Sequence, residues 1–253
     1  MSISHNPMFN RAMQTGVEQA RLDIPQEAVD AEFAKITSTA KMTLEGTAAK
    51  VFGMFLVLLA AAGVTWFMQL TALILPAAIV GLVLGLVATF GKKVRPALYV
   101  AYAAAQGVFL GGLTLVFESM YPGIAQNAVL ATLATAGSMF AAYRFGWIKV
   151  NARFTRVMTF AMMGYLAFAL INFVVSLATN SAGAYGTGFG WVIALVGVAL
   201  AAFTLNLDFE AIVVGVREGL PVENEWRAAF GLTASLIWLY VEILRLLAIF
   251  NRD

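Results

Sequence analysis

The chain has 253 residues, of which 61% are hydrophobic and only 12% carry a charge. Soluble globular domains carry about 25% charged residues, so this composition excludes an ordinary soluble protein and predicts an integral membrane protein. The sequence has no cysteine and one histidine, His5, which excludes disulfides, thiolate metal sites and a histidine-based zinc or catalytic centre.

Residues 1–47 form a polar zone that mixes charged and small residues with few large apolar ones. The zone lacks the apolar core and small-residue cleavage site of a signal peptide. We therefore expect a flexible cytosolic N-terminal tail over residues 1–47, with a short helix near Gln26–Ala34. Residues 48–253 are expected to form the transmembrane domain.

A helix that crosses a membrane needs about 20 predominantly apolar residues. Segments that satisfy this requirement are Val51–Leu70, Leu73–Phe90, Ala97–Phe117, Ala128–Ile148, Val157–Leu177, Trp191–Val214 and Ala228–Phe250. Short linkers with turn-forming or polar residues separate them. The pattern predicts an all-α membrane protein, a bundle of seven transmembrane helices.

The basic residues indicate the orientation of this bundle. Fourteen of the sixteen lie in the N-terminal tail or in the linkers after the second, fourth and sixth segments. Because Lys and Arg accumulate on the cytosolic side, this distribution predicts a cytosolic N-terminus in the bacterial inner membrane. The exceptions, Arg245 and Arg252, would be explained if the last segment turned back as a re-entrant loop, but its length favours a full crossing.

Two pairs of glycines recur at helical spacing, Gly81 with Gly85 and Gly107 with Gly111. Small residues four positions apart lie on one face of a helix and let the backbones of two membrane helices approach closely. We expect both pairs to mark tightly packed helix interfaces.

Charged side chains within the apolar segments are the candidate functional residues, because an ionised group in hydrocarbon costs several kcal/mol on most estimates. The sixth segment contains Asp208 and Glu210, and the seventh contains Glu242 and Arg245. Asp208 and Glu210 lie about 200° apart around a helix, so they cannot share a face. Glu210 is closer to the cytosolic end, which leaves Asp208 as the deeper carboxylate.

The sixth and seventh segments are predicted to form an antiparallel hairpin, in which Asp208 and Glu242 each lie 17 residues from Glu225. If the turn is centred a few residues earlier, nearer Pro221, the two carboxylates would still be within about two helical turns in depth. Two carboxylates that meet away from water cannot both ionise cheaply, so they would share a proton. They also provide the oxygen ligands that calcium prefers. Asp208 and Glu242 are therefore a candidate pH-sensing and calcium-binding pair.

A structural interpretation of the same residues is equally compatible with the sequence. Arg245 lies three residues after Glu242 and shares its face, so the two would neutralise each other without an ion. Asp208 would then hydrogen-bond to Asn206, Asn172 or Thr204. If both groups act together, Arg245 is the counter-ion of the acidic pair.

Three stretches carry a family resemblance: "AQGVFLGGLTLVFE", "LNLDFEAI" and "SLIWLYVEILRLL". With the seven-segment plan, they resemble the Bax inhibitor-1 (YccA-like, transmembrane BAX inhibitor motif) membrane proteins, in a prokaryotic branch. The resemblance covers nearly everything after residue 45. It implies a calcium leak controlled by pH through one acidic residue on each of the last two helices, which fall on Asp208 and Glu242. A glutamate at 242 and an arginine at 245 depart from the family pattern.

Two functions follow from these observations. The first is a pH-sensitive leak channel or transporter for calcium or another cation. The alternative is a non-transporting regulator of proteolysis or stress responses, with a membrane protease as partner. An enzyme is not expected, because no catalytic motif, nucleotide site or nucleic-acid-binding face is found, and no cofactor beyond a possible calcium ion is implied. An ordinary secondary transporter stays open, although no internal repeat supports it.

Overall fold

The computed structural model describes residues 40–252, so the expected tail helix at Gln26–Ala34 lies outside the described residues. Two short 3-10 helices, η1 (Thr71–Leu73) and η2 (Gly183–Gly186), precede α4 and α8. The long helices are α3 (Leu44–Phe67), α4 (Ile74–Phe90), α5 (Pro96–Met120), α6 (Ile124–Arg144), α7 (Ala152–Thr179), α8 (Gly190–Arg217) and α9 (Asn224–Phe250). Each of these seven, with α4 taken together with η1, is long and apolar enough to cross a membrane, which confirms the predicted fold class.

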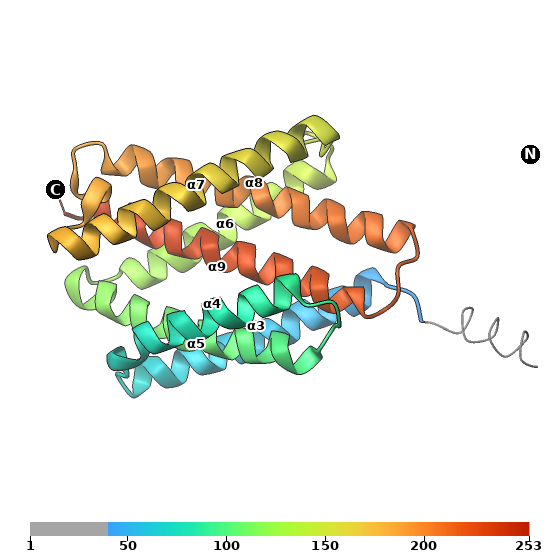
Figure 1. The fold of residues 1–253 in the computed structure, drawn as a ribbon, viewed down its shortest axis with the longest axis horizontal. Helices are drawn as coiled ribbons and strands as arrows, with labels where there is room; N and C mark the ends of the chain where they lie inside the picture. Colours follow the sequence, from blue (N-terminus) through green and yellow to red (C-terminus); the bar gives the residue numbers. More distant parts are fainter. Residues whose placement is uncertain (1–39, 253) are drawn as a thin grey trace, which may run out of the picture. The chain divides into compact units, whose positions relative to one another are not determined.

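Helix α9 occupies the centre of the bundle. Consecutive helices run in opposite directions along the long axis, with α3, α4 and α5 on one side of α9 and α7 and α8 on the other (Figure 1). Helix α9 contacts α3, α5, α6 and α8. None of its residues from Ala228 to Ile249 is exposed. As a continuous helix of 27 residues, it spans about 40 Å, which contradicts the re-entrant alternative.

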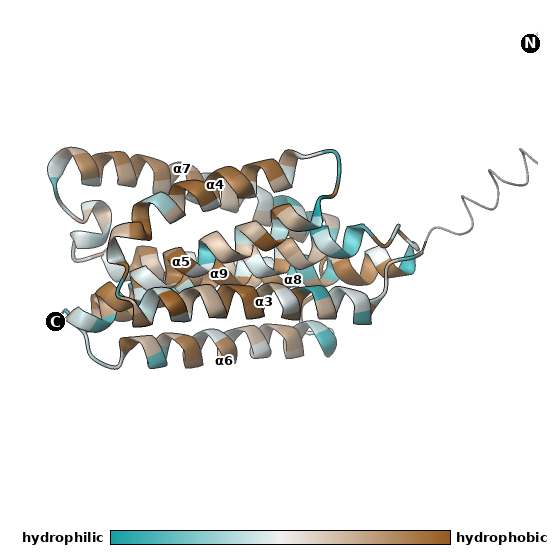
Figure 2. Cartoon of the chain, turned by 90° about the horizontal axis from the view of Figure 1, so that it is seen from below, coloured by the Kyte–Doolittle hydropathy of each residue, from teal (hydrophilic) through white to brown (hydrophobic). Residues whose placement is uncertain are grey.

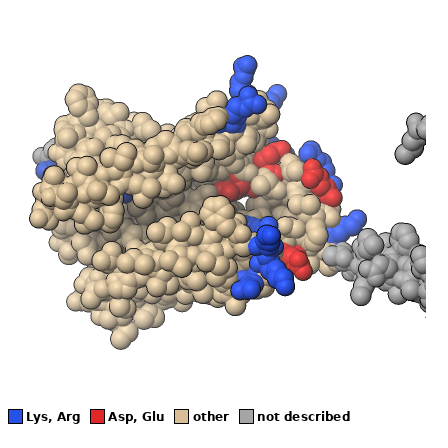
Figure 3. Space-filling model, viewed as in Figure 1, with Lys and Arg blue, Asp and Glu red and all other residues tan. Residues whose placement is uncertain are grey.

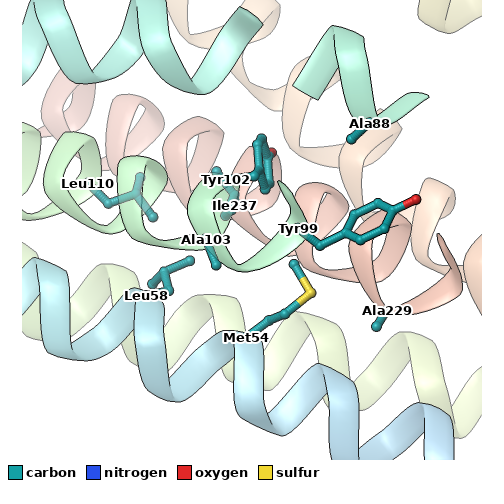
Figure 4. Close-up of a cluster of buried hydrophobic side chains, with 9 residues drawn as sticks. All are labelled: Met54, Leu58, Ala88, Tyr99, Tyr102, Ala103, Leu110, Ala229 and Ile237. Carbon is teal, nitrogen blue, oxygen red and sulfur yellow. The ribbon is translucent and has the colours of Figure 1, made fainter. Parts of the chain in front are cut away.

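Two clusters of buried apolar side chains share α9. In the first, Met54 and Leu58 of α3 pack with Tyr99 and Ala103 of α5, while Ile237 of α9 closes the cluster (Figure 4). The second joins α6, α8 and α9 through Ala128, Leu205 and Leu239, among others. Because each cluster takes part of its surface from α9, the two halves of the bundle are held together by this helix.

Helix α7 is the least buried of the long helices, and Met158 is its only buried residue. Its principal contacts are with α8 and η2. Apolar residues cover most of its length, and hydrophilic ones gather toward the helix ends and connections of the bundle (Figure 2). A helix with this surface is suited to face lipid along most of its length.

The helices extend beyond the predicted apolar segments, most clearly in α3, which begins at Leu44 instead of Val51. Thr43 caps this helix, because its side chain accepts a hydrogen bond from Gly46 N at 2.9 Å. A hydropathy window detects only the part of a helix that lies in hydrocarbon. It therefore missed the polar first turns, and the helical domain begins before residue 48.

The chain just before α3 is fastened to the connection between α8 and α9. The backbone N–H of Met42 donates to Leu220 O at 2.7 Å, and its buried side chain lies against Gly215. Glu225, 2% exposed, accepts hydrogen bonds from the backbone N–H and hydroxyl of Thr43 and forms an ion pair with Lys50. We call this set of contacts the α3–α9 latch.

Both glycine pairs lie at close helix interfaces, as predicted. A Cβ atom at Gly107 would lie 2.8 Å from Ala61 Cβ of α3, and one at Gly111 would lie 2.8 Å from Ala62 Cα. A Cβ at Gly81 or Gly85 would instead meet side chains of α5. The α3–α5 interface therefore brings two backbones together where only glycine fits.

Replacing Gly107 or Gly111 by alanine is expected to lower the free energy of unfolding by about 1–3 kcal/mol, because the new methyl group has no space. Denaturant unfolding of the purified protein in detergent measures this change. Gly137→Ala is the matched control, since nothing lies within 4 Å of a Cβ at this mid-helix position. Equal stability of all three variants would contradict close packing of α3 on α5.

Candidate functional site

Asp208 lies on α8 and faces α9. One carboxylate oxygen, Oδ1, would be 3.1 Å from a Cβ at Gly231, and the Ser235 hydroxyl lies near the carboxylate. The other oxygen, Oδ2, is buried and has no hydrogen-bond partner among the described residues. The glycine at 231 provides the space that the carboxylate occupies. Asp208 is therefore a half-buried acid whose buried oxygen has no partner among the described residues.

Glu242 lies on α9 in a fully partnered environment. It is 3% exposed, and its Oε1 accepts a hydrogen bond from Trp238 Nε1 at 3.1 Å. Its Oε2 pairs with Arg245 Nη1 at 2.7 Å. A Cβ at Gly197 of α8 would lie 2.6 Å from the same oxygen, so a glycine again makes room for a carboxylate.

Arg245 is held by aromatic side chains as well as by Glu242. Its Nη1 also donates to Tyr185 Oη at 3.1 Å, and its guanidinium carbon lies 4.5 Å from the centre of the Tyr185 ring. Tyr165 Oη lies 3.0 Å from Tyr185 Oη. This geometry matches the structural interpretation, in which Arg245 neutralises Glu242 without an ion.

The structure does not bring Asp208 and Glu242 together as a direct pair. Asp208 faces Gly231 and Ser235, whereas Glu242 faces Gly197, eleven residues from Asp208 on α8. Ser235 and Glu242 are seven residues apart, or roughly 10 Å along α9. Gly231, which Asp208 also faces, is eleven residues from Glu242, so the carboxylates are two to three turns apart in depth, at or beyond the expected separation, and they share no partner.

The reason for this offset is the position of the turn. Helix α8 ends at Arg217 and α9 begins at Asn224, so the hairpin is centred near Leu220. The sequence-based pairing was counted from Glu225, with a centre nearer Pro221 as the alternative, and the structure agrees with the alternative. Glu225 belongs to the first turn of α9, where it forms the α3–α9 latch. A shift of five residues in the centre moves the residue opposite Asp208 by ten positions.

The partners suggested for Asp208 from sequence are engaged elsewhere. The hydroxyl of Thr204 donates to the backbone of its own helix, and Asn172 accepts from Ala184 N at 2.7 Å. Asn206 Nδ2 lies 3.6 Å from Met139 Sδ of α6. The sequence did not lead to Ser235 as a neighbour of Asp208. Its hydroxyl, a polar group within the apolar seventh segment, was the signal that could have identified it.

Calcium ligands do not converge around Asp208. No group of three or more His, Cys, Asp or Glu side chains that could hold a metal occurs in the described part of the chain. Asn206 Oδ1 and Thr233 Oγ1 are also buried without a partner there. Asn206 is two residues from Asp208 on α8, and Thr233 is two residues from both Gly231 and Ser235 on α9. A separation of two residues is about 200° around a helix, so neither side chain points at the Asp208 carboxylate. The site has one carboxylate and one hydroxyl, enough for a proton or a transient cation.

Two other carboxylates near helix ends, Glu210 and Glu118, have structural partners. Glu210 accepts a hydrogen bond from Tyr143 Oη at 2.7 Å, which ties α8 to α6. Glu118 accepts hydrogen bonds from Gly123 N at 2.6 Å and Ala125 N at 2.9 Å, so it caps the start of α6. Of the acids on α8 and α9 within the bundle, Asp208 alone retains a buried oxygen without a partner among the described residues.

Comparison with protein families gives one match over nearly the whole chain. The model of the family described as Bax inhibitor 1 like matches residues 6–252. The chain belongs to this family. The match confirms the resemblance drawn from the motifs on α5, α8 and α9, and together with seven membrane-spanning helices it makes the chain a multi-pass membrane protein. Comparison with curated proteins gives no match.

Glu242→Gln is expected to lower the free energy of unfolding by about 2 kcal/mol, because Arg245 would lose its counter-charge in the bundle. The loss is below that of a fully buried pair since the Arg245 side chain is 33% exposed. The double variant Glu242→Gln/Arg245→Gln should lose less than the sum of the single variants. Denaturant unfolding in detergent measures all three.

Glu210→Gln is the control for this double-mutant cycle. It should lower the free energy of unfolding by only about 1 kcal/mol, because it weakens one hydrogen bond, from Tyr143. Strictly additive losses in the double variant would show that Glu242 and Arg245 do not interact.

Proposed function

We propose that this protein is a pH-sensitive leak pathway for cations, with calcium as the leading ion, and that Asp208 is the group that binds the ion or a proton. The observation that supports the proposal most is the buried Asp208 Oδ2, which has no partner among the described residues. Buried polar atoms are nearly always hydrogen-bonded, so an unsatisfied carboxylate oxygen is compatible with a proton or a cation as its partner. Charged groups at such positions commonly mark ion or proton pathways.

Glu242 and Arg245 take part as a fixed, neutral pair on the same face of α9. Ser235, beside Asp208, and Glu242 are seven residues apart and therefore nearly in line along α9. A rotation or shift of α9 would disturb both the Asp208 site and the ion pair. In this mechanism, protonation of Asp208 removes its negative charge, changes its attraction for cations and alters its contact with α9.

The N-terminus is proposed to lie in the cytosol of a bacterium. Most Lys and Arg side chains visible in Figure 3 gather at one end of the bundle, where α3 begins and α4 and α8 end. Clustering of basic residues at one end of a membrane bundle is typical of its cytosolic side. The C-terminal end of α9 would then lie on the opposite side of the inner membrane.

The test is calcium flux into vesicles that contain the purified protein and an internal calcium-sensitive dye. Wild-type protein is expected to leak at a rate that changes across the neutral pH range, and Asp208→Asn is expected to abolish this change because its side chain cannot titrate. Glu210→Gln, on the same helix, should retain it. A pH response in Asp208→Asn equal to that of the wild type would refute the role of Asp208.

A non-transporting regulator, with a membrane protease as partner, is the second candidate. The α3–α9 latch favours it, because Met42 and Thr43, just after the tail, bind the connection between α8 and α9 and the first turn of α9. A partner that binds the tail would therefore act close to these two helices. Deleting residues 2–39 keeps the latch and removes only the tail. Loss of partner binding in this deletion, with no calcium flux in the wild type, would support the regulator.

A further inference from the structure

A cavity of about 640 Å³ lies at the C-terminal end of α9, away from Asp208. It is bounded by the last turns of α5, α7 and α9 and by the connection between α7 and α8. Two arginines, Arg245 and Arg252, line it from α9 and the residues that follow. None of the functions considered above uses this cavity.

The polar part of the cavity carries an excess of positive charge. Arg245 is balanced by Glu242, but Arg252 adds a second cation, and no acidic side chain lines the cavity within the described residues. Arg245 donates to its protein partners through Nη1 only, so Nε and Nη2 have no hydrogen-bond partner among the described residues. The Asn172 side-chain amide lies at the same wall. These groups are hydrogen-bond donors suited to a phosphate or carboxylate.

The rest of the lining is apolar and reaches the lipid-facing surface. Phe117 and Met120 of α5 line one side, and Phe173 of α7 lines the other. Met120 and Phe173 are 53% and 55% exposed, so the rim of the cavity is accessible from outside the bundle. Helix α7 packs principally on α8 and η2, leaving a gap toward α5. A hollow is visible on this face of the bundle between its two halves (Figure 3).

We propose that this cavity binds the phosphate headgroup of an anionic phospholipid, whose acyl chain leaves between α5 and α7. Arginines at membrane depth bind phosphate through paired N–H donors, and basic pockets between transmembrane helices are suited to anionic headgroups. The apolar rim explains why the ligand is an amphiphile and not a free anion. The same positive charge disfavours the cavity as an entrance for cations. This inference does not depend on the proposed leak.

The experiment is native mass spectrometry of the full-length protein in detergent, titrated with phosphatidylglycerol. Phosphatidylcholine with the same acyl chains is the zwitterionic control, and inorganic phosphate tests a free anion. Wild-type protein should retain phosphatidylglycerol in preference to both. Arg252→Gln should weaken this binding about fivefold, as expected for one basic side chain near the headgroup. Arg156→Gln, which does not line the cavity, should leave it unchanged.

A second pair of variants separates the cavity from general attraction by charge. Ala169→Phe fills the cavity from α7 without altering any charge, and it should reduce phosphatidylglycerol binding at least as much as Arg252→Gln. Ala167→Phe lies on the exposed surface of the same helix and should not. Equal retention of the two lipids, equally tight binding of inorganic phosphate, or normal binding by both Arg252→Gln and Ala169→Phe would overturn the proposal.

Discussion

The structure depends on one constraint, which is that α9 is surrounded by other helices from Ala228 to Ile249. A helix that runs through the middle of a membrane bundle has no water to solvate its polar groups, so each must find a partner within the protein. Glu225 finds Lys50 and Thr43, and Glu242 finds Arg245 and Trp238. The glycines at 46 and 197 leave the space that these carboxylates occupy.

Asp208 differs from Glu225 and Glu242, because one of its oxygens is buried without a partner among the described residues. It faces α9 at a glycine and a serine, and neither supplies a positive charge. The two carboxylates of α9 already have basic partners of their own, Lys50 and Arg245. The bundle therefore has a structural carboxylate at each end of α9 and, between them, a carboxylate from α8 whose charge is not compensated by a basic side chain. This absence of a basic partner is the basis for proposing that Asp208 responds to protons or cations.

Hydrophobic segment length predicted the seven helices well, because a membrane requires the same length of apolar chain in every crossing. Glycine spacing likewise predicted close packing at Gly107 and Gly111, since small residues four positions apart share one face, but the structure was needed to show that the partner is α3. The Asp208–Glu242 pair was not predictable in the same way. Its register depends on the position of the α8–α9 turn, whose centre lies about five residues before Glu225.

The details that sequence could not show are contacts between segments distant along the chain. Lys50 and Glu225 are separated by 175 residues, and neither stands out in a composition window. Arg245 did stand out as the neighbour of Glu242, because spacing within one helix is visible in sequence. Its contact with Tyr185 and its place in the cavity could not be predicted, because they depend on how α5, α7 and η2 lie around α9.

The α3–α9 latch also determines where the protein can be shortened. A hydropathy boundary at residue 47 suggests that everything before it is dispensable, yet Met42 and Thr43 lie upstream of that boundary and hold the α8–α9 connection. A shortened chain that begins at residue 48 would leave Glu225 buried opposite Lys50 alone and would free the turn that sets the depth of Asp208. Tags, fusion partners and protease sites therefore belong before residue 40, where they do not interrupt the first fastening of the bundle.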